Sequence, residues 1–331
     1  MKLAIVIINW NGIKLLKKFL MPLITHNNNE NEIYVIDNNS SDDSIDYIKT
    51  NFPKIKIIEN PKNYGYAKGY NEGIKKINAD ILCLLNNDVQ VTKNWITPIM
   101  DEFKVNSTTA AIQPKILNYK NKDYFDYAGA AGGYMDCLGY PYCDGRVHNL
   151  LEKDNKQYDY NKEIFWASGA CFFIRKEVFR KLNGFDPDFF AHQEEIDLCW
   201  RAFNLGFQTK FTYKSTVYHV GGATLQQSNP KKTFLNFRNS LLMLVKNLPK
   251  NQLFPILFIR LCLDGLAGIQ FLVKGKFSHF FAIIKAHFAF YSIGYQFYKK
   301  RTTHQRSNYF KIKSIVYRYF IKNGKVFEAI F

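Results

Sequence analysis

The sequence lacks the patterns that mark a disulfide-rich, zinc-binding or secreted protein. Its six cysteines include no Cys-x-x-Cys pair, and most of them stand within apolar runs. We therefore expect buried thiols in a reducing compartment. The apolar run near the amino terminus covers only Leu3 to Ile8, and no small-residue cleavage site follows it. A buried strand fits this run better than a secretory leader.

Acidic residues are nearly absent from the last third of the chain. Residues 229–331 hold 18 Lys and Arg against two acids, Asp264 and Glu328, whereas residues 1–228 hold 27 basic and 26 acidic groups. With 331 residues, 47% of them hydrophobic, the chain can fill one large core or two domains. We predict a boundary near residues 228–232, between a domain at 1–228 and a basic region at 229–331.

The basic region has many apolar residues but no uncharged stretch of 18, because Asp264, Lys274, Lys276 and Lys285 interrupt it. A spanning helix is therefore not expected. Amphipathic helices lying in a membrane interface fit better, since each Lys or Arg near an anionic surface adds roughly 1 kcal/mol. An ordinary helical subdomain with a solvated basic side remains the alternative. Nucleic acid is not an expected partner, because the aromatics stand in dense apolar runs.

The first part of the chain alternates strand-like and helix-like segments. Strand-like runs such as "KLAIVIIN", "EIYVID", "KIKIIEN" and "DILCLLN" are separated by segments with helical spacing. This alternation predicts an α/β fold with a mostly parallel sheet flanked by helices. Ligands of such sheets sit beyond the carboxyl ends of the strands. We therefore expect Asp37, Asn63 and Asp88 to lie at one edge.

Three polar clusters follow these strands. In "VIDNNSSDDS", Asp37 can accept hydrogen bonds from a base or ribose. The loop "NPKNYGYAKGYNEG" holds three glycines and Lys68, which suits a close approach to phosphate. In "LLNNDV", Asp88 could hold a divalent cation that bridges two phosphates. The simpler alternative for this last cluster is a strand that ends in a turn.

A fourth cluster, "FDPDFFAHQEEIDLCWR", is acidic. Glu194, Glu195 and Asp197 repel one another among apolar residues, which raises at least one pKa and suits proton abstraction. A helix amino terminus made acidic to suit its dipole is the alternative.

Seven motifs in order resemble family 2 glycosyltransferases of the GT-A fold, most closely the rhamnosyltransferase-like bacterial branch. They span roughly residues 1–240: "VIINWNG", "VIDNNSSDDS", "NYGYAKGYNEG", "LLNNDV", "WASGACFFIRKEVFRKLNGFDPDFF", "EEIDLCWR" and "YHVGGAT". The resemblance implies sugar transfer from a nucleotide diphosphate donor with inversion at the anomeric carbon.

The resemblance also implies roles for individual residues. The second member of the pair Glu194–Glu195 would be the general base, at a position where relatives carry Asp. Asp88 would match the last residue of a D-x-D metal motif whose first position is here Asn86, and His219 would complete the Mg²⁺ or Mn²⁺ site. Acceptor and sugar contacts would come from Trp166, Ser168 and Gly169. Donor contacts would come from Asn9, Asp37, Asn39, Ser40, Asn63, Gly65, Lys68, Asn71, Asn86 and Asn87.

The expected function is therefore an inverting glycosyltransferase that uses dTDP-rhamnose or a UDP-hexose. No Q-x-x-R-W signature of processive synthases is present, so we expect single additions to a lipid-linked or polysaccharide acceptor. The expected location is cytoplasmic, at the inner face of the cell membrane. A nucleotidyltransferase and a non-catalytic membrane-bound nucleotide-sugar or carbohydrate-binding protein remain the alternatives, and the sequence leaves the oligomeric state open.

Overall fold

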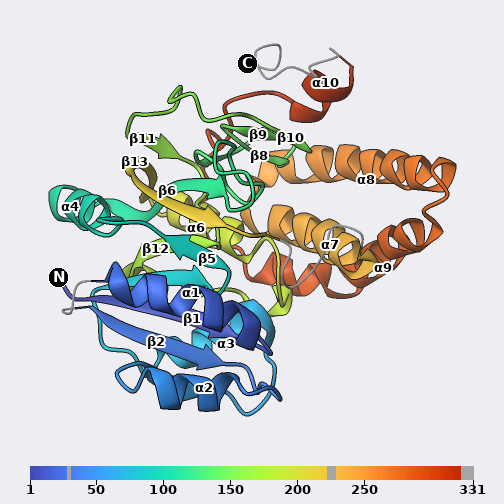
Figure 1. The fold of residues 1–331 in the computed structure, drawn as a ribbon. Helices are drawn as coiled ribbons and strands as arrows, with labels where there is room; N and C mark the ends of the chain where they lie inside the picture. The colour runs from blue at the N-terminus through green and yellow to red at the C-terminus, as the bar shows by residue number, and fades with distance from the viewer. Residues whose placement is uncertain (28–30, 222–228, 322–331) are drawn as a thin grey trace.

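The computed structural model describes residues 1–27, 31–221 and 229–321. In this part of the chain, a nine-stranded sheet with helices against it forms the centre (Figure 1). Its order is β11-β13-β6-β12-β4-β1-β2-β3, and β5 pairs with β13. The strands are β1 (Leu3–Asn9), β2 (Glu32–Asp37), β3 (Lys56–Glu59), β4 (Ile81–Asn86), β5 (Val89–Val91), β6 (Thr109–Asn118), β11 (Lys162–Ile164), β12 (Cys171–Arg175) and β13 (Gln208–His219). The predicted α/β class is confirmed.

Strands β4, β1, β2 and β3 run parallel, as the alternating sequence pattern predicts. Helices α1 (Ile13–Thr25), α2 (Ser44–Asn51) and α3 (Gly65–Ile74) connect them. β1 and β4 are buried on both faces, which explains their unbroken apolar sequence. The register sets Asn9 beside Asp37 and Ile8 beside Asn86. The carboxyl ends of these strands therefore form one polar edge.

Strand β12 brings a distant segment to the same edge. It runs antiparallel to β4 and β6, so its first residue, Cys171, pairs with Leu85 near the end of β4. The amide of Asn86 donates to the carbonyl of Ala170 at 3.0 Å. Residues just before β12 consequently lie beside the polar edge. Helix α4 (Thr97–Val105) precedes β6, and α5 (Lys176–Lys181), a short 3-10 turn (Pro187–Phe189) and α6 (Glu194–Asn204) follow β12.

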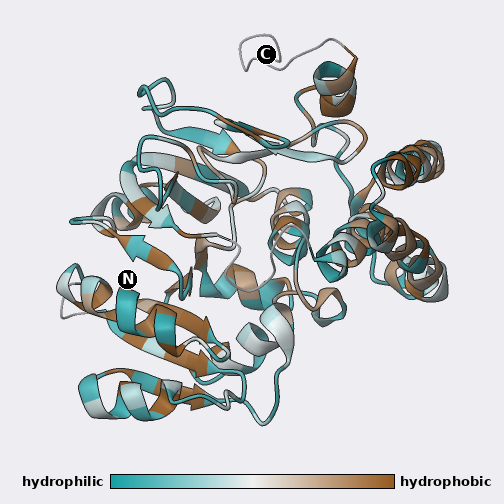
Figure 2. Ribbon diagram, turned by 45° about the vertical axis from the view of Figure 1, so that its right-hand side comes forward, coloured by the Kyte–Doolittle hydropathy of each residue, from teal (hydrophilic) through white to brown (hydrophobic). Residues whose placement is uncertain are grey.

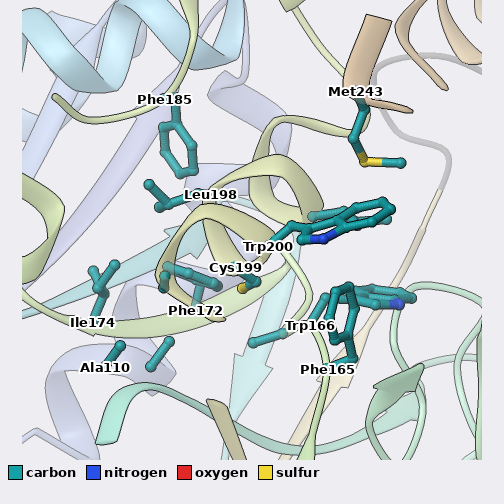
Figure 3. Packing of buried hydrophobic residues seen from close by; sticks show 14 of the residues in the cluster. Ala110, Phe165, Trp166, Phe172, Ile174, Phe185, Leu198, Cys199, Trp200 and Met243 are labelled. Atoms are coloured by element: carbon teal, nitrogen blue, oxygen red, sulfur yellow. The ribbon is translucent and has the colours of Figure 1, made fainter. Parts of the chain in front are cut away.

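Two hydrophobic clusters lie on the two faces of the sheet. Alternation along β1 divides them, since Val6 belongs to one cluster and Ile5 to the other. Figure 3 shows part of the first cluster, where Phe172 of β12 lies beside Cys199 of α6 and Trp200 of α6 lies toward Met243 of α7 (Pro230–Asn247). This part of the core therefore joins the sheet to the carboxyl-terminal helices.

A small four-stranded sheet covers the end of the large one. It contains β7 (Gly133–Met135), β8 (Pro141–Cys143), β9 (Arg146–Val147) and β10 (Leu150–Leu151). Residues 309–315 bind to this small sheet. The Ile315 amide donates to Asp136 at 2.9 Å, and the Tyr309 hydroxyl donates to the Cys137 carbonyl at 2.7 Å. All six cysteines are free thiols, and four of them, Cys83, Cys143, Cys171 and Cys199, are buried.

The predicted helical region is present as α7 (Pro230–Asn247), α8 (Lys250–Val273), α9 (Phe277–Lys299) and α10 (Ile315–Phe320). α7 packs against α6 and α9, whereas α8 and α9 extend away from the sheet (Figure 1). Because α7 shares its core with the sheet, it is part of the body that carries the polar edge. The proposed division between residues 228 and 229 stays a prediction, and residues 222–228 lie outside the described residues.

Candidate active site

Polar side chains from three strand ends form a continuous hydrogen-bonded row. Asn87 Nδ2 donates to Asn9 Oδ1 at 3.0 Å, and Asn9 Nδ2 donates to Asp37 Oδ1 at 3.1 Å. Asp37 also accepts bonds from the amide and hydroxyl of Ser40, at 2.8 and 2.6 Å. These four predicted residues do lie together. Asn39 is exposed and has a φ of 61°, so it stands at the turn after the row.

The second predicted loop lies against the segment that precedes α6. Asn63 Oδ1 accepts a bond from the Gly65 amide at 2.9 Å. Gly65 has a φ of +73°, and a Cβ there would lie 2.6 Å from the Phe190 ring, so only glycine fits. Lys68 is exposed, with its ammonium 4.5 Å from the centre of the Tyr64 ring. Lys68 is therefore free to meet a phosphate.

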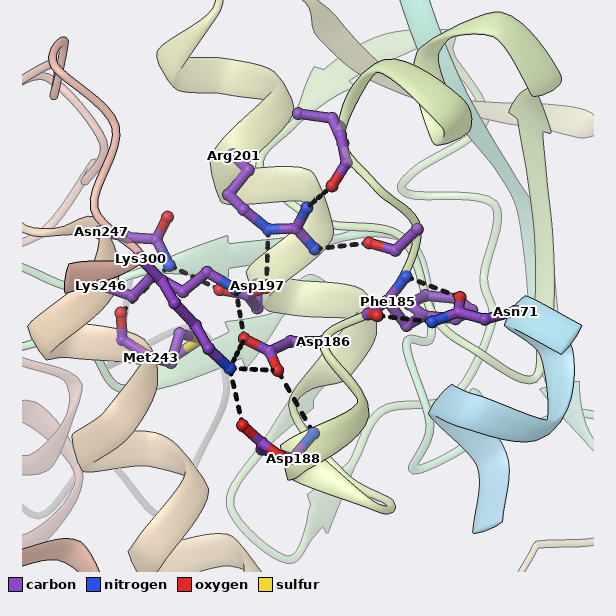
Figure 4. Close-up of polar contacts among 12 residues, drawn as sticks. Asn71, Phe185, Asp186, Asp188, Asp197, Arg201, Met243, Lys246, Asn247 and Lys300 are labelled. Carbon is purple, nitrogen blue, oxygen red and sulfur yellow. Dashed lines mark hydrogen bonds and ion pairs between the residues drawn. The ribbon is translucent and has the colours of Figure 1, made fainter. Parts of the chain in front are cut away.

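Asn71 takes a different place from the one expected. Its Nδ2 donates to the Phe185 carbonyl at 2.7 Å, and its Oδ1 accepts a bond from the Phe185 amide at 3.0 Å (Figure 4). Both polar atoms are thus used by one peptide backbone. The structure shows Asn71 as a clamp for the segment before α6, instead of a side chain lining the nucleotide pocket.

Asp88 and His219 meet, and a third residue joins them. His219 Nε2 lies 3.2 Å from Asp88 Oδ1, and His219 Nδ1 lies 2.8 Å from Asp126 Oδ1. Burial alone would lower the pKa of His219, but the two carboxylates outweigh it and raise the pKa to about 10. Burial acts to raise the pKa of Asp88, and the His219 charge outweighs it and lowers the pKa. Asp88, His219 and Asp126 therefore form a buried carboxylate–imidazolium–carboxylate arrangement.

The Asp88–His219 pair offers one oxygen and one nitrogen donor at neighbouring positions. A divalent ion that shares substrate phosphates takes few protein ligands and keeps several waters, so two donors fit such an ion. Among the described residues, no group of three or more His, Cys, Asp or Glu side chains is arranged to hold a metal ion alone. Metal binding would require His219 to release its proton. The donor set therefore fits an ion that arrives with a diphosphate.

Glu194 and Glu195 open helix α6 with buried carboxyl groups. Burial raises the pKa of both, and the Glu195 charge raises that of Glu194 further. The backbone of Gly169 lies beside the Glu195 carboxyl and partly offsets this rise in pKa. Within the described residues, Oε2 of each glutamate has no hydrogen-bond partner. An unpaired buried carboxyl oxygen with a raised pKa suits a general base.

The backbone before these glutamates is strained. Phe190, His192 and Gln193 have φ values of 64°, 70° and 76°, in the left-handed region that L-residues rarely adopt. The Tyr66 amide donates to the Phe190 carbonyl at 2.9 Å and helps to hold the segment. Strain of this kind persists when its surroundings fix it, and it is common at functional sites. The segment that leads into Glu194 and Glu195 is therefore held in an unusual backbone conformation.

Asp197 lies apart from this pair in function, although it is on the same helix. Its carboxylate accepts bonds from Arg201 at 2.8 Å, Lys246 at 3.0 Å and Asn247 at 2.8 Å (Figure 4). Lys246 also donates to Asp186 at 2.8 Å. Burial acts to raise the pKa of Asp197, but Arg201 and Lys246 outweigh it and lower the pKa. The carboxylate is fully engaged, so the structure shows a packing anchor between α6 and α7 instead of a catalytic group.

Of the three residues predicted to contact the sugar, two lie in the interior and one lies beside the glutamate pair. Trp166 is 4% exposed and donates to the Tyr134 carbonyl at 2.9 Å, so it belongs to the core. Ser168 is buried, and its hydroxyl accepts a bond from the Ala170 amide at 3.2 Å. Gly169 lies next to Glu195: a Cβ there would stand 3.8 Å from the Glu195 carboxyl carbon. Of the three, Gly169 is the one placed to border a substrate.

Two residues of the site escaped sequence reasoning. One is Asp126, whose carboxylate pairs with Nδ1 of His219. The other is Tyr66, whose hydroxyl donates to the Gly169 carbonyl at 2.9 Å. Asp126 stands two positions before the small-residue run 128–133, which was a weak signal for a conformationally special segment. Tyr66 lies within the motif "NYGYAKGYNEG", but its partner is 103 positions away.

Comparison with protein families settles the family. The profile of glycosyl transferase family 2 matches residues 4–182, which is more than half of the 331 residues. The chain belongs to glycosyl transferase family 2. The family 2 match ends before α6, so the placement of Glu194 and Glu195 rests on the structure described above.

Relatives of this family 2 chain act on several sugars. It is 27% identical over 207 residues to the low-salt glycan biosynthesis hexosyltransferase Agl10 of Haloferax volcanii, covering 60% of this chain and 61% of the relative. It is 22% identical over 222 residues to an N-acetylglucosaminyl-diphospho-decaprenol L-rhamnosyltransferase of Mycobacterium tuberculosis, covering 62% and 71%. About two fifths of the hexosyltransferase's length is therefore without a counterpart in the alignment.

Solved structures confirm the GT-A fold. GalNAc-T7 with UDP, GalNAc and Mn²⁺ has a TM-score of 0.55 at 20% identity, covering 66% of this chain and 43% of that one. Staphylococcus aureus TarS 1–349 with UDP-GlcNAc has a TM-score of 0.53 at 13% identity, covering 79% and 72%. The mannosyltransferase PcManGT of Pyrobaculum calidifontis, with GDP-Man and Mn²⁺, has a TM-score of 0.52 at 10% identity, covering 89% and 75%.

Proposed function

We propose that this chain transfers a hexosyl group from a nucleoside diphosphate sugar to a glycan or lipid-linked acceptor, with inversion at the anomeric carbon. The observation that carries the proposal is Glu195: a buried carboxyl with a raised pKa and an unpaired oxygen. Gly169 connects it to the edge that holds Asp88, because β12 pairs antiparallel with β4 beyond Gly169. A proton acceptor and an anion-compensating group thus share one edge.

Each group then has a role. In an inverting transfer, Glu195 accepts the proton of the acceptor hydroxyl as the new bond forms, on the face opposite the leaving diphosphate. Asp88 and His219 would hold a divalent ion together with that diphosphate, and the ion when bound would neutralise charge on the leaving group. Because an imidazole nitrogen is a softer ligand than Mg²⁺ prefers, Mn²⁺ suits this pair better. Mn²⁺ is the ion in the GalNAc-T7 and PcManGT structures.

The proposed donor is dTDP-rhamnose or a UDP-hexose. Two relatives support this choice, a rhamnosyltransferase and a hexosyltransferase, and TarS was solved with UDP-GlcNAc. In this chain the row Asn87–Asn9–Asp37–Ser40 lies at the strand ends where the nucleotide would rest. Lys68 is the exposed cation of the adjoining loop.

Donor turnover tests the function. Purified protein with Mn²⁺ is incubated with dTDP-rhamnose, UDP-glucose, UDP-GlcNAc and GDP-mannose, and release of the nucleoside diphosphate is measured. We expect release from one class of donor and none without the divalent ion. A non-catalytic binder would be stabilised by the donor in thermal unfolding yet release nothing. A nucleotidyltransferase would release pyrophosphate from a nucleoside triphosphate instead.

We also propose attachment to the cytoplasmic face of an anionic membrane through α8 and α9. Both helices carry large apolar side chains that are exposed: Phe254, Phe258, Leu266, Ile269 and Val273 on α8, and Phe277, Phe281, Phe288, Tyr291 and Tyr295 on α9. The two helices project from the body as predominantly hydrophobic ribbons (Figure 2). An exposed apolar surface of this kind is typical of a partner or membrane interface.

The charges that interrupt the sequence of α8 do not face outward. Arg260 and Asp264 are each 2% exposed. Arg260 donates to the Leu138 carbonyl at 3.0 Å and to Ser240 at 2.7 Å, and Asp264 lies 3.2 Å from His287. Of the charges that the sequence sets against a spanning helix, Asp264 therefore turns inward, whereas Lys274 and Lys276 remain exposed.

Among the described residues, a single helix, α8, is long and apolar enough to cross a membrane. Only 22% of its most apolar 18-residue segment is buried. A single helix of this kind is weak support for a span. Interfacial attachment remains our proposal because Lys274 and Lys276, both exposed at the α8–α9 turn, suit anionic headgroups.

A further inference from the structure

Arg146 of β9 is a buried cation that forms no ion pair with another described residue. Its side chain belongs to a residue that is 9% exposed, and its guanidinium carbon lies 4.6 Å from the centre of the Tyr127 ring. One guanidinium nitrogen donates to Cys143 Sγ at 3.4 Å. Within the described residues Nε has no hydrogen-bond partner and Arg146 forms no ion pair. Burying a guanidinium in this way is unfavourable unless an anion joins it.

A second cation faces the same ring. Lys232, in the first turn of α7, has its ammonium 5.8 Å from the centre of Tyr127. Both cations thus face one ring, and burial together with the charge of Arg146 lowers the pKa of Lys232. Lys232 also makes no ion pair with another described residue. We call Arg146 and Lys232 the Tyr127 cation pair.

The Tyr127 cation pair lies beside the candidate active site. Tyr127 directly follows Asp126, the partner of His219. On the other side, His192 lies near Lys232, whose charge adds to burial in lowering the His192 pKa to about 4. His192 Nε2 is buried and has no partner among the described residues, two positions before Glu194. The pair therefore stands between the Asp88–His219 row and the segment that carries the glutamates.

We propose that the Tyr127 cation pair, with His192 as a neutral hydrogen-bonding group, binds a phosphoryl group of a substrate. Guanidinium and ammonium groups are the usual ligands of phosphate oxygens, and a buried Arg146 with a half-buried Lys232 would bind more strongly than two solvated cations. The identification of the substrate rests on the proposed function: the phosphoryl belongs either to the diphosphate of the donor or to a phosphate-linked acceptor. The charge of Asp126 acts on Arg146, but the ion pair that Asp126 forms is with His219, which also pairs with Asp88.

The test measures binding of inorganic pyrophosphate to the full chain by isothermal titration calorimetry. We compare wild type with Arg146→Gln, with Lys232→Gln and with Lys93→Gln, which removes an exposed lysine after β5. We expect roughly tenfold or greater weakening in the first two variants and none in the third, because hydrogen bonds to charged groups contribute about 1.5–3 kcal/mol. Unchanged affinity in the first two, or equal loss in Lys93→Gln, would overturn the site.

Stability separates binding from a merely structural role. Lys232→Gln removes a half-buried, unpaired cation, so the variant should unfold at the same or a higher temperature than wild type. Loss of pyrophosphate binding together with a marked fall in unfolding temperature would mean that the lysine supports the fold, and would contradict the proposal.

A second arm identifies the source of the phosphoryl group. The titration is repeated with UDP and Mn²⁺ at saturation. Pyrophosphate binding that persists and still depends on Lys232 assigns the site to an acceptor phosphate. Competition by UDP, with weaker UDP binding in Lys232→Gln, assigns it to the donor. Failure of donor turnover with intact pyrophosphate binding would sink the proposed function and leave the anion site standing.

Discussion

The sheet body and the α8–α9 hairpin use similar apolar residues for opposite purposes. Phe172 and Phe173 of β12 are fully buried, one on each face of the sheet. Phe254 and Phe258 of α8 are 77% and 70% exposed. An apolar run in a sequence therefore indicates that a surface needs covering, but it does not say whether the protein itself supplies the cover.

The charged residues of the two regions also differ, because those of the body are buried and paired whereas those at the hairpin turn are exposed. In the body, the charged side chains Asp197, Arg201 and Lys246 are buried and bound to one another. In the hairpin, Lys274 and Lys276 are exposed at the turn. Buried charges must be paired, whereas exposed ones remain available to a surface of opposite sign. This difference fits the proposed roles of the two regions, catalysis in the body and membrane attachment at the hairpin.

The largest expected effect comes from the body. Glu195→Gln keeps the size of the side chain but removes the proton acceptor, so kcat for sugar transfer should fall by about 10²- to 10⁴-fold. Donor affinity, measured by calorimetry, should stay near that of wild type. Glu194→Gln is the matched control, and a larger loss there would move the base to the neighbouring residue.

The same carboxyl determines how activity and stability depend on pH. Burial raises the pKa of Glu195 above the ordinary 4.5, so kcat/KM should rise with pH until the raised pKa is passed. Because the folded state holds this proton more tightly, its contribution to stability is fully present below pH 4.5 and is lost as pH rises through the raised pKa. Glu195→Gln should therefore gain stability over wild type with rising pH, as followed by denaturant unfolding.

A second change in the body tests the buried ion cluster. Asp197→Ala leaves Lys246 and Arg201 without a shared partner in the interior, so the free energy of unfolding should fall by about 3–5 kcal/mol. Urea unfolding measures this loss. Retained stability with reduced kcat would instead return Asp197 to the catalytic role expected from the sequence.

A matched pair of phenylalanines compares the two regions directly. Phe172→Ala should lower the free energy of unfolding by about 3–5 kcal/mol because it empties part of the core. Phe258→Ala should change stability by less than about 0.5 kcal/mol, yet weaken binding to anionic vesicles by roughly tenfold, since a buried phenylalanine contributes about 1.5–3 kcal/mol. Sedimentation with vesicles measures the loss of membrane binding. Equal sedimentation of wild type and Phe258→Ala would contradict the membrane proposal.

Point substitutions are preferable to truncation here. A cut at residue 250 would remove Phe297, which is fully buried, and Lys300, which binds Asp186 at 2.8 Å. The body would then lose part of its own core. A truncated protein that left the membrane would not separate loss of attachment from loss of folding.

The smallest expected effect concerns a single charge of the hairpin. Lys276→Gln should weaken vesicle binding by about 1 kcal/mol at low salt, and the difference from wild type should shrink as ionic strength rises. The exposed Lys93→Gln, on the body, should show no such difference. Salt-independent loss would point to an apolar contact of the lysine stem instead.

Much of the site was predictable because strand ends follow directly from the apolar pattern. Asp37, Asn87 and Asp88 come at the carboxyl ends of strands, and the parallel arrangement brings them to one edge. The misplaced residues share a different property. Asn71 binds a backbone 114 positions away, and Asp197 binds Lys246 49 positions away. A motif shows that a polar residue is present but not which partner already occupies it.

The sequence by itself determined the alternation of strands and helices, the polar edge and the basic, apolar character of the last hundred residues, because each depends on local pattern and composition. The tertiary structure alone decided which carboxyls keep an oxygen without a partner among the described residues, Glu194 and Glu195, and which is fully bound, Asp197. It also decided that Arg260 and Asp264 turn inward and leave one face of α8 apolar. Pairing and burial are relations between distant residues, so they exist only once the chain has folded.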